Sequence, residues 1–417
     1  MTGEKEVRGA NRPGPRPLGL HLALQSLTWL SSRSALPFLK AGWQPWSPEL
    51  TSEAEALAKE LAAADPRALE AAVDAEAAIR FARFLQGVAA YRAHPARRSA
   101  GDIPVVWSEG TTRLLDYGLG KGGKRGGVPV LVVPSLINRF YVLDLAPGRS
   151  LLRHLAQAGL RPFVVDWDAP GETERGFGLS DYVAGRLERA LDVVTAETGR
   201  PAAVMGYCMG GLLALALAAR RPAEVSALAL LATPWDFATL PEAKRQSLAL
   251  MMPGLELMMG AFGALPVDVL QALFASLDPW LTVRKFRRFT PRDEEPAADS
   301  LFVALEDWLN DGVPLSAPVA RETLAGWYLE NLPGRGEWQI GDLAVQPAEV
   351  RQPALVMVPA RDHIVAPESA WPLATALPRA DGRAIAAGHI GMVAGSRGPE
   401  LVHAPLAEWL LEAGGGR

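Results

Sequence analysis

A single cysteine stands where a short strand is expected to turn into a helix. Residues 206–210 read Gly-Tyr-Cys-Met-Gly, so Cys208 takes the serine position of a Gly-x-Ser-x-Gly nucleophile motif. A helix N-terminus directly after the turn stabilises negative charge on the sulfur. We therefore expect Cys208 to act as the nucleophile in acyl transfer. The alternative is a small buried apolar residue, the common fate of a free cysteine.

A cysteine nucleophile needs a base, and the base needs a group that orients it. In α/β-hydrolases these residues follow in the order nucleophile, acid, histidine. Asp362 comes directly after an apolar run typical of a buried strand, and His389 follows the next such run. Functional side chains gather at the carboxyl ends of parallel strands. We therefore expect His389 to serve as the base and Asp362 to orient it.

Alternatives stay open for both of these roles. His363 adjoins Asp362 and competes with His389 for the role of base. Three other aspartates follow earlier predicted strands and could replace Asp362, namely Asp166, Asp168 and Asp236.

The oxyanion of an acyl-transfer intermediate needs two backbone N–H donors. We expect the first from Met209, the residue after the nucleophile, and the second from the loop after the first core strand. The candidates in that loop are Ser135, Leu136 and Ile137. Asn138, Arg139 and Tyr141 follow in the same loop. For these residues a structural role in holding the loop is at least as well supported as a role in the chemistry.

Composition narrows the classes of function. The chain has 417 residues, of which 49% are hydrophobic and 21% are charged, which is typical of a globular protein. Its 42 Lys and Arg against 46 Asp and Glu give a net charge of −4, so nucleic-acid binding is not indicated. No zinc-type cluster occurs, and the glycine run at 120–127 lacks the Walker spacing. We expect neither a metal nor a cofactor.

The single cysteine also bears on the compartment. It excludes an intramolecular disulfide framework and favours a reducing environment. The first 17 residues lack the apolar core of a secretory signal. The apolar stretches 18–30 and 248–265 are interrupted by polar residues or proline, so neither predicts a transmembrane segment. We expect a cytoplasmic protein.

The pattern of the core predicts an α/β fold with a mostly parallel sheet and helices on both faces. From Val128 onward, short and nearly unbroken apolar runs alternate with helical segments, as in parallel strands buried on both faces. The alternation stops near residue 240 and resumes near 346. We expect a catalytic core of residues 126–240 and 346–417.

Two further regions are expected around this core. Residues 1–125 predict a helical N-terminal region with a short hairpin near 103–117; one helix is expected from a capping box at Ser52 and Glu55, and another from an N-cap at Asp65. Residues 241–345 predict a mostly helical cap rich in Met and Trp. This insert could be a mobile lid or an ordinary cap that uses Met as filler.

The ordered set of motifs resembles the polyhydroxyalkanoate synthase family. The resemblance rests on VPSLINRFYVLD, GYCMGG, ARDHIVAP and GHIGMVAG, which together span roughly residues 128 to 400. It implies an α/β-hydrolase fold and an acyltransferase that polymerises (R)-3-hydroxyacyl-CoA into polyhydroxyalkanoate. It also implies a triad of Cys208, Asp362 and His389. The chain is shorter than single-subunit synthases, and its cap lacks their Tyr-Trp-Asn run.

The resemblance further implies a hydroxyacyl-CoA substrate, a homodimer and association with the granule surface. A thioesterase, an esterase or an intracellular polyhydroxyalkanoate depolymerase with the same triad is the alternative. A non-enzymatic alternative keeps the fold as a binding module on a granule or membrane face. Its segment would be Leu18–Leu30, which we expect to be buried against the core instead.

Overall fold

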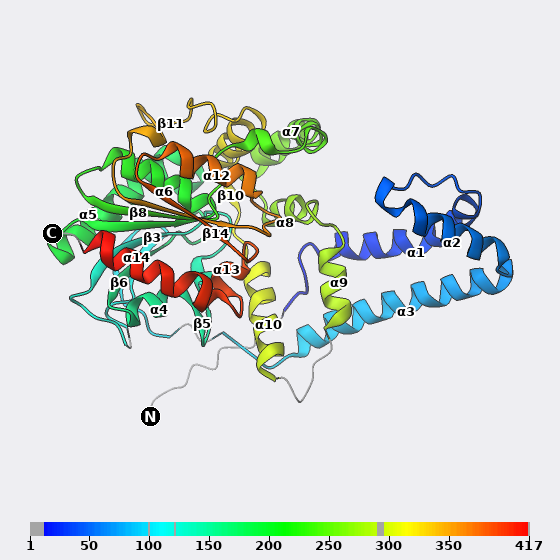
Figure 1. Cartoon of the computed structure of the whole chain (residues 1–417). Helices are drawn as coiled ribbons and strands as arrows, with labels where there is room; N and C mark the ends of the chain where they lie inside the picture. The colour runs from blue at the N-terminus through cyan, green and yellow to red at the C-terminus, as the bar shows by residue number, and fades with distance from the viewer. Residues whose placement is uncertain (1–11, 99–100, 121, 290–295, 416–417) are drawn as a thin grey trace. The chain divides into compact units, whose positions relative to one another are not determined.

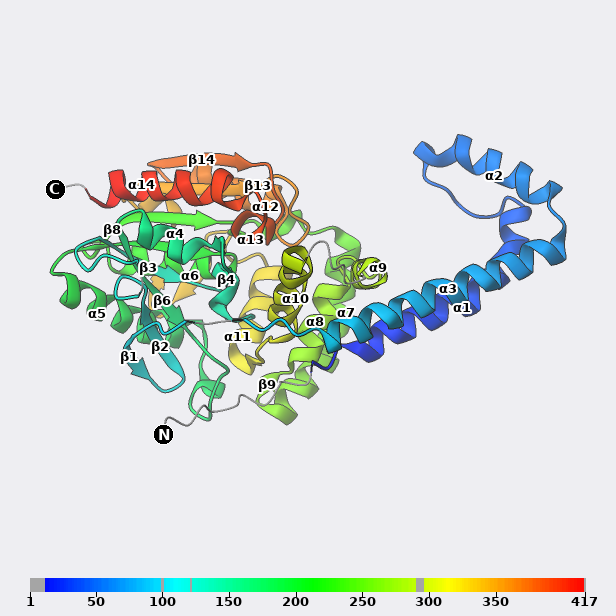
Figure 2. The ribbon, with the colours of Figure 1, turned by 90° about the horizontal axis from the view of Figure 1, so that it is seen from below.

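The computed structural model describes residues 12–98, 101–120, 122–289 and 296–415. It divides into two compact units (Figures 1 and 2). The smaller unit comprises the described residues of Met1–Ala96 and Gln271–Glu306, and the larger those of Arg97–Leu270 and Asp307–Arg417. The insert expected at 241–345 is thus shared between the two units.

An eight-stranded sheet forms the centre of the larger unit (Figure 1). In spatial order its strands are β1 (Val105–Glu109), β2 (Thr112–Asp116), β6 (Leu160–Asp166), β3 (Val128–Val133), β7 (Ala202–Tyr207), β8 (Val225–Leu231), β13 (Ala354–Pro359) and β14 (Ala380–Ile385). The pairs from β6 to β14 are parallel, whereas β2 runs antiparallel to both β1 and β6. The expected hairpin is confirmed, and it extends this sheet at one edge.

Helices cover both faces of the sheet, which confirms the predicted α/β fold. Figure 1 shows α4 (Leu151–Gln157) and α14 (Ala404–Gly414) on one face, and α5 (Glu188–Thr198), α6 (Met209–Arg220) and α12 (Pro367–Ala376) on the other. Residues Met209 to Ala218 of α6 are all buried, as expected of a helix that is apolar on every side.

Short elements complete the larger unit. They are η2 (Phe140–Leu143), β4 (Asp144–Ala146), β5 (Arg149–Ser150), η3 (Glu174–Gly176), η4 (Asp181–Leu187), η5 (Phe237–Thr239), β9 (Ala264–Leu265), β10 (Leu315–Ser316), α11 (Ala317–Arg321), η6 (Glu322–Leu329), β11 (Gln339–Ile340), β12 (Leu343–Ala344), η7 (Pro347–Glu349), α13 (Gly391–Ala394) and η8 (Pro399–His403). The helix α7 (Glu242–Phe262) is longer, and α8 (Val267–Ala275) contains the division between the units.

The smaller unit is helical. It contains α1 (Leu18–Lys40), η1 (Pro48–Leu50), α2 (Thr51–Ala63), α3 (Pro66–Ala93), α9 (Leu281–Arg288) and most of α10 (Pro296–Asn310). Its core is formed by Phe84, Val88, Tyr91, Val283, Phe286, Phe289 and Val303. Gly87 lets α9 approach α3 closely, because a side chain there would overlap the Phe286 carbonyl. The apolar face of the short basic helix α9 is thereby buried.

The two predicted helix starts have different outcomes. The N-cap at Asp65 is confirmed, since its side chain accepts a hydrogen bond from the Ala68 N–H at 2.8 Å. The capping box at Ser52 is wrong, because the 3-10 turn of η1 leads directly into α2 and places Leu50 at the cap position. Proline at the start of η1 favours this earlier turn.

The segment Leu18–Leu30 is only partly buried. The side chains that α1 buries are His21, Gln25 and Leu36, whereas Leu27 and Leu30 are 62% and 72% exposed. Burial of this segment was therefore the wrong expectation for those two leucines. Within the described residues, no helix has both the length and the apolar character that crossing a bilayer requires.

Candidate active site

Cys208 occupies a sharp turn between β7 and α6. Its φ of 56° is unusual for a residue with a side chain and costs of the order of 1–3 kcal/mol. The surrounding backbone holds the turn, since the Cys208 N–H donates to Leu231 and its carbonyl accepts from Gly211, both at 2.9 Å. Gly210 is required by space, because a side chain there would overlap the Val133 carbonyl. The motif thus has the strained geometry expected of a nucleophile turn.

Asp362 and His389 meet beyond the ends of two adjacent parallel strands, β13 and β14. The Oδ2 atom of Asp362 lies 2.7 Å from Nδ1 of His389, and both residues are buried. The other carboxylate oxygen accepts backbone hydrogen bonds from Ile364 at 2.8 Å and Val365 at 2.9 Å. The carboxylate is therefore fixed in position, and it fixes the imidazole.

The His389 ring also lies near the Cys208 side chain, close enough for the charge of the sulfur to act on the imidazole. Burial acts to lower the pKa of His389, but the negative charge of Cys208 and the contact with Asp362 outweigh it and raise the pKa to about 10. Negative charge at these two neighbours therefore favours the protonated imidazole. A histidine beside the cysteine in this way can exchange a proton with it during acyl transfer.

Tyr207, the residue before Cys208, holds the backbone of His389 through a hydrogen bond. Its hydroxyl donates to the His389 carbonyl at 3.1 Å, and the two rings lie 5.1 Å apart. Burial, followed by the charges of Cys208 and Asp362, raises the pKa of Tyr207 well above its usual value. Tyr207 therefore stays protonated and holds the backbone that carries His389.

The loop after β3 lies against the start of α6, as the close approach of Gly210 to Pro134 shows. Among its candidate donors, Ile137 gives its N–H to the Ser135 hydroxyl at 3.1 Å. The Ile137 N–H is therefore already used within the loop. Leu136 and Met209 are both buried. Their service as oxyanion donors stays a prediction, and of the three loop candidates the geometry favours Leu136 over Ile137.

Arg139 fastens the same loop to two other segments. Its guanidinium pairs with Asp168, after β6, at 2.7 Å and with Asp311 at 3.0 Å. The indole N–H of Trp308 donates to the Arg139 carbonyl at 2.7 Å, and the hydroxyl of Tyr141 donates to Asp311 at 3.0 Å. Asn138 bridges to Gly312 in the same region. These contacts support the interpretation that residues 138–141 hold the loop.

The competing candidates are engaged elsewhere. Asp166 pairs with Arg113 at 2.5 Å, and Asp168 pairs with Arg139. Asp236 accepts a hydrogen bond from the Asn331 amide at 2.8 Å. His363 is exposed. The histidine that Asp362 contacts is His389.

Sequence reasoning missed Tyr328, which lies on η6 and is near enough to Cys208 to be affected by its charge. Burial, together with the negative charge of Cys208, raises the pKa of this tyrosine. Its ring packs edge-on against the ring of Phe237, with 4.9 Å between the ring centres. The ring of Trp327 stacks on Phe237 as well, with 5.8 Å between the centres. The available signal was the adjacent aromatic pair Trp327-Tyr328.

Two protein families match the chain. Residues 100–155 match the N-terminus of poly-beta-hydroxybutyrate polymerase (PhaC), and residues 128–395 match the alpha/beta hydrolase fold. Among solved structures, the monoacylglycerol lipase of Paleococcus ferrophilus is similar with a TM-score of 0.47 and 18% identity, over 72% of this chain and 99% of that one.

Two relatives are polymerase subunits. The chain is 31% identical over 294 residues to the poly(3-hydroxyalkanoate) polymerase subunit PhaC of Synechocystis sp., which covers 68% of this chain and 78% of that protein. It is 30% identical over 320 residues to the same subunit of Haloferax mediterranei, covering 75% of this chain. That match spans 65% of the Haloferax protein, slightly less than two thirds.

Proposed function

This chain belongs to the poly(3-hydroxyalkanoate) polymerase family, within the α/β-hydrolase fold, and on that basis we propose that it polymerises (R)-3-hydroxyacyl-CoA into polyhydroxyalkanoate. The observation that carries the proposal is the arrangement at the strand ends. Asp362 lies 2.7 Å from a histidine whose pKa is raised by the nearby Cys208, a residue held at a positive φ between strand and helix. Such a site transfers acyl groups through a covalent thioester.

In the first step, the Cys208 thiol gives its proton to His389, and its sulfur attacks the carbonyl carbon of the hydroxyacyl thioester. Backbone N–H groups of Met209 and the loop after β3 stabilise the oxyanion. When the carbon–sulfur bond to coenzyme A breaks, the His389 imidazolium gives its proton to the departing sulfur. The products are free coenzyme A and an acyl-enzyme on Cys208.

In the second step, the hydroxyl of a second hydroxyacyl group attacks the acyl-enzyme. Neutral His389 takes the hydroxyl proton, the new ester bond forms, and the bond to the Cys208 sulfur breaks. Asp362 orients His389 in both steps and stabilises its charged form. Attack by water in place of the hydroxyl would make the same site a hydrolase, so exclusion of water decides between polymer and free acid.

The decisive experiment incubates the purified protein with (R)-3-hydroxybutyryl-CoA while coenzyme A release and product size are followed together. We expect coenzyme A release accompanied by polymer. Release with only free hydroxyacid would identify a thioesterase. Absence of release, combined with hydrolysis of simple esters or of polymer, would identify an esterase or a depolymerase.

The proposal includes a cap over the site. The aromatic residues Phe237, Trp327 and Tyr328 lie on η5 and η6. Tyr328 is near enough to Cys208 for the charge of Cys208 to raise its pKa. An apolar wall of this kind keeps water from the acyl-enzyme. Hydrogen exchange with and without a substrate analogue tests whether this wall moves. Protection of η6 equal to that of the sheet in both states would argue against a lid.

Granule association and a homodimer complete the proposal. Large apolar side chains are exposed on the helical unit, including Trp43 at 73% and Leu30 at 72%. An exposed apolar surface of this kind suits contact with a polyester surface. Another apolar set is exposed on α7 in the larger unit, and we assign it to contact with a second copy of the chain.

A further inference from the structure

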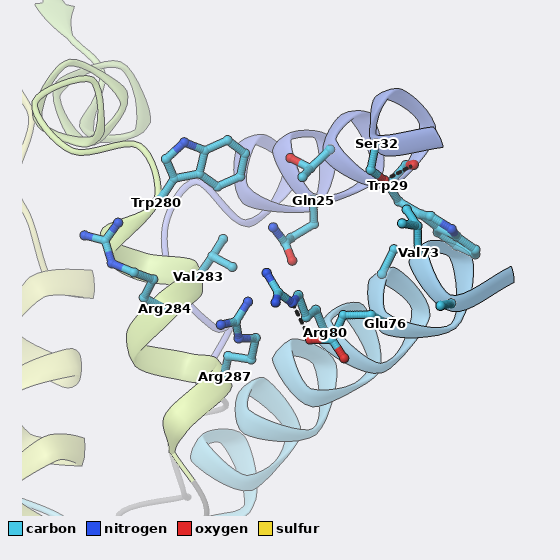
Figure 3. Close-up of a pocket in the computed structure, with 13 residues that line it drawn as sticks. Gln25, Trp29, Ser32, Val73, Glu76, Arg80, Trp280, Val283, Arg284 and Arg287 are labelled. Atoms are coloured by element: carbon cyan, nitrogen blue, oxygen red, sulfur yellow. Dashed lines mark hydrogen bonds and ion pairs between the residues drawn. The ribbon is translucent and has the colours of Figure 1, made fainter. Parts of the chain in front are cut away.

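The helical unit contains a groove that the proposed chemistry does not use. It has a volume of about 610 Å³ and lies between α1, α3 and α9 (Figure 3). That volume is within the range of small-molecule sites, roughly 300–1,000 Å³. Its walls are mostly apolar and include Val73, Ala77, Val283 and the rings of Trp29 and Trp280.

Gln25 points into this groove from α1. Figure 3 shows its side chain extending between α3 and α9, toward Arg80 and Arg287. The residue is only 8% exposed, and within the described chain its amide has no hydrogen-bonding partner. Its amide lines the groove and is not sealed from it, so a ligand in the groove can accept a hydrogen bond from the amide N–H.

The charged groups of the groove are mostly donors. Arg80 pairs with Glu76 at 2.6 Å, and Arg284 pairs with Asp278 at 2.5 Å. Arg287 has no ion-pair partner among the described residues. Three guanidinium groups therefore face one lining carboxylate.

The hydroxyl groups that line the groove are already used within α1. Thr28 donates to the Leu24 carbonyl and Ser32 to the Trp29 carbonyl, both at 2.8 Å. The groups left for a ligand are thus guanidinium and amide donors beside apolar walls. The groove is suited to a molecule that is apolar along its length, offers acceptors only, and carries a negative charge.

We propose that this groove binds a released oligo(3-hydroxyalkanoate) chain by the carboxylate that cleavage of its thioester by water leaves, an inference that rests on the proposed polymerase function. The ester carbonyls of such a segment only accept hydrogen bonds, and its alkyl groups match the apolar walls. The carboxylate pairs with Arg287, and a carbonyl accepts from the Gln25 amide. An extended peptide fits less well, because each of its N–H groups needs an acceptor.

The test measures binding of the (R)-3-hydroxybutyrate tetramer to full-length Cys208→Ala protein by calorimetry. This background removes turnover. The free acid is expected to bind at least tenfold more tightly than its methyl ester, because the ester lacks the charge that pairs with Arg287. Equal affinity for the acid and the ester, or no binding of either, would overturn the proposal.

Two variants in the groove locate the site. Arg287→Ala is expected to weaken tetramer binding about tenfold, and Gln25→Leu severalfold, since each removes one donor to the ligand. Arg288→Ala is the matched control, because it removes the same charge from the same helix outside the groove. An equal loss in Arg287→Ala and Arg288→Ala would indicate nonspecific charge attraction, and no loss in Gln25→Leu would show that its amide does not contact the ligand; either result contradicts the proposed site.

Two further measurements separate this inference from the function on which it rests. The first measures coenzyme A binding to the same groove variants. If the groove binds coenzyme A and does not bind the tetramer, the inference is overturned. Release of coenzyme A by the unmodified protein tests the polymerase independently. Release without tetramer binding rejects the groove alone, whereas tetramer binding without release supports the groove and rejects the polymerase.

Discussion

The carboxylate of Asp362 lies 2.7 Å from Nδ1 of His389, which leaves the opposite ring nitrogen for Cys208. Two backbone N–H groups hold the second oxygen of Asp362, so the carboxylate cannot rotate away without losing both. The carboxylate thereby selects the tautomer and the orientation of the imidazole. This relationship makes the roles of the three residues separately testable.

Replacement of the nucleophile should abolish the reaction. Cys208→Ala is expected to remove both turnover and covalent labelling by acyl-CoA analogues, because no other side chain can form the thioester. Cys208→Ser is expected to retain at most a trace of activity. Intact-protein mass spectrometry after incubation with the analogue measures the adduct. Full activity of the alanine variant would rule out the covalent mechanism.

Replacement of the two histidines should have unequal effects. His389→Ala is expected to lower the rate by roughly 10²–10⁴-fold, the usual effect of losing a positioned base. His363→Ala is the matched control, because this exposed neighbour of Asp362 does not replace His389 in the pair. Rates of coenzyme A release give the comparison. A larger loss in His363→Ala than in His389→Ala would reverse the assignment.

The protonation of His389 should depend on the cysteine. Its pKa is raised to about 10, above the ordinary 6.5, chiefly because the charge of Cys208 outweighs burial. In Cys208→Ala that charge is absent while burial remains, so the pKa of His389 should fall. Histidine ring resonances followed by NMR from pH 5 to 10.5 report the midpoint. The same midpoint in both proteins would show that Asp362 alone sets the protonation.

Arg139 should be required for rate although it touches no reacting atom. Arg139→Ala breaks the ion pairs that join the loop after β3 to Asp168 and Asp311. A displacement of this loop by about 1 Å can cost roughly 10²-fold in rate. We expect kcat to fall while KM changes little.

The conservative variant and a surface control complete this test. Arg139→Lys should not restore the rate, because an ammonium group cannot span the two carboxylates as a guanidinium does. Arg335→Ala, which removes an exposed pair with Glu337, should have the full rate. An unaltered rate in Arg139→Ala would mean that the loop keeps its position without the pairs.

The contact between Asp362 and His389 could be predicted from the sequence because its signals are local. Gly206, Cys208 and Gly210 specify a turn that few other residues permit, and the aspartate and histidine follow consecutive strands. Order along the chain therefore predicted proximity in space for Asp362 and His389. The same reasoning placed the sheet and its helices.

What the sequence could not supply depends on distant segments. Tyr328 on η6 lies near enough to Cys208 to be affected by its charge, although the two are about 120 positions apart in the chain, and no sequence periodicity predicts that proximity. The burial of Gln25 in place of Leu27 and Leu30 was equally hidden, because it depends on which face of α1 packs against α3. Tertiary packing thus decides both features.

The outer face of α7 should mediate self-association. Leu248, Leu255 and Met259 face inward, whereas Leu250 and Leu257 are 83% and 78% exposed. Exposed apolar side chains seven residues apart, or about two helical turns, form a stripe that a second copy can cover. Leu250→Asp should therefore convert a dimer into a monomer, because a carboxylate buried in that contact lacks a partner.

A neighbouring position on α7 supplies the control for this last test. Ala249 is exposed, and it projects about 100° around the helix from Leu250. Ala249→Asp adds the same charge but should leave the dimer intact. Analytical ultracentrifugation over a range of concentrations measures both variants beside the unmodified protein. A monomeric unmodified protein, or equal dissociation of the two variants, would show that this stripe is not the contact.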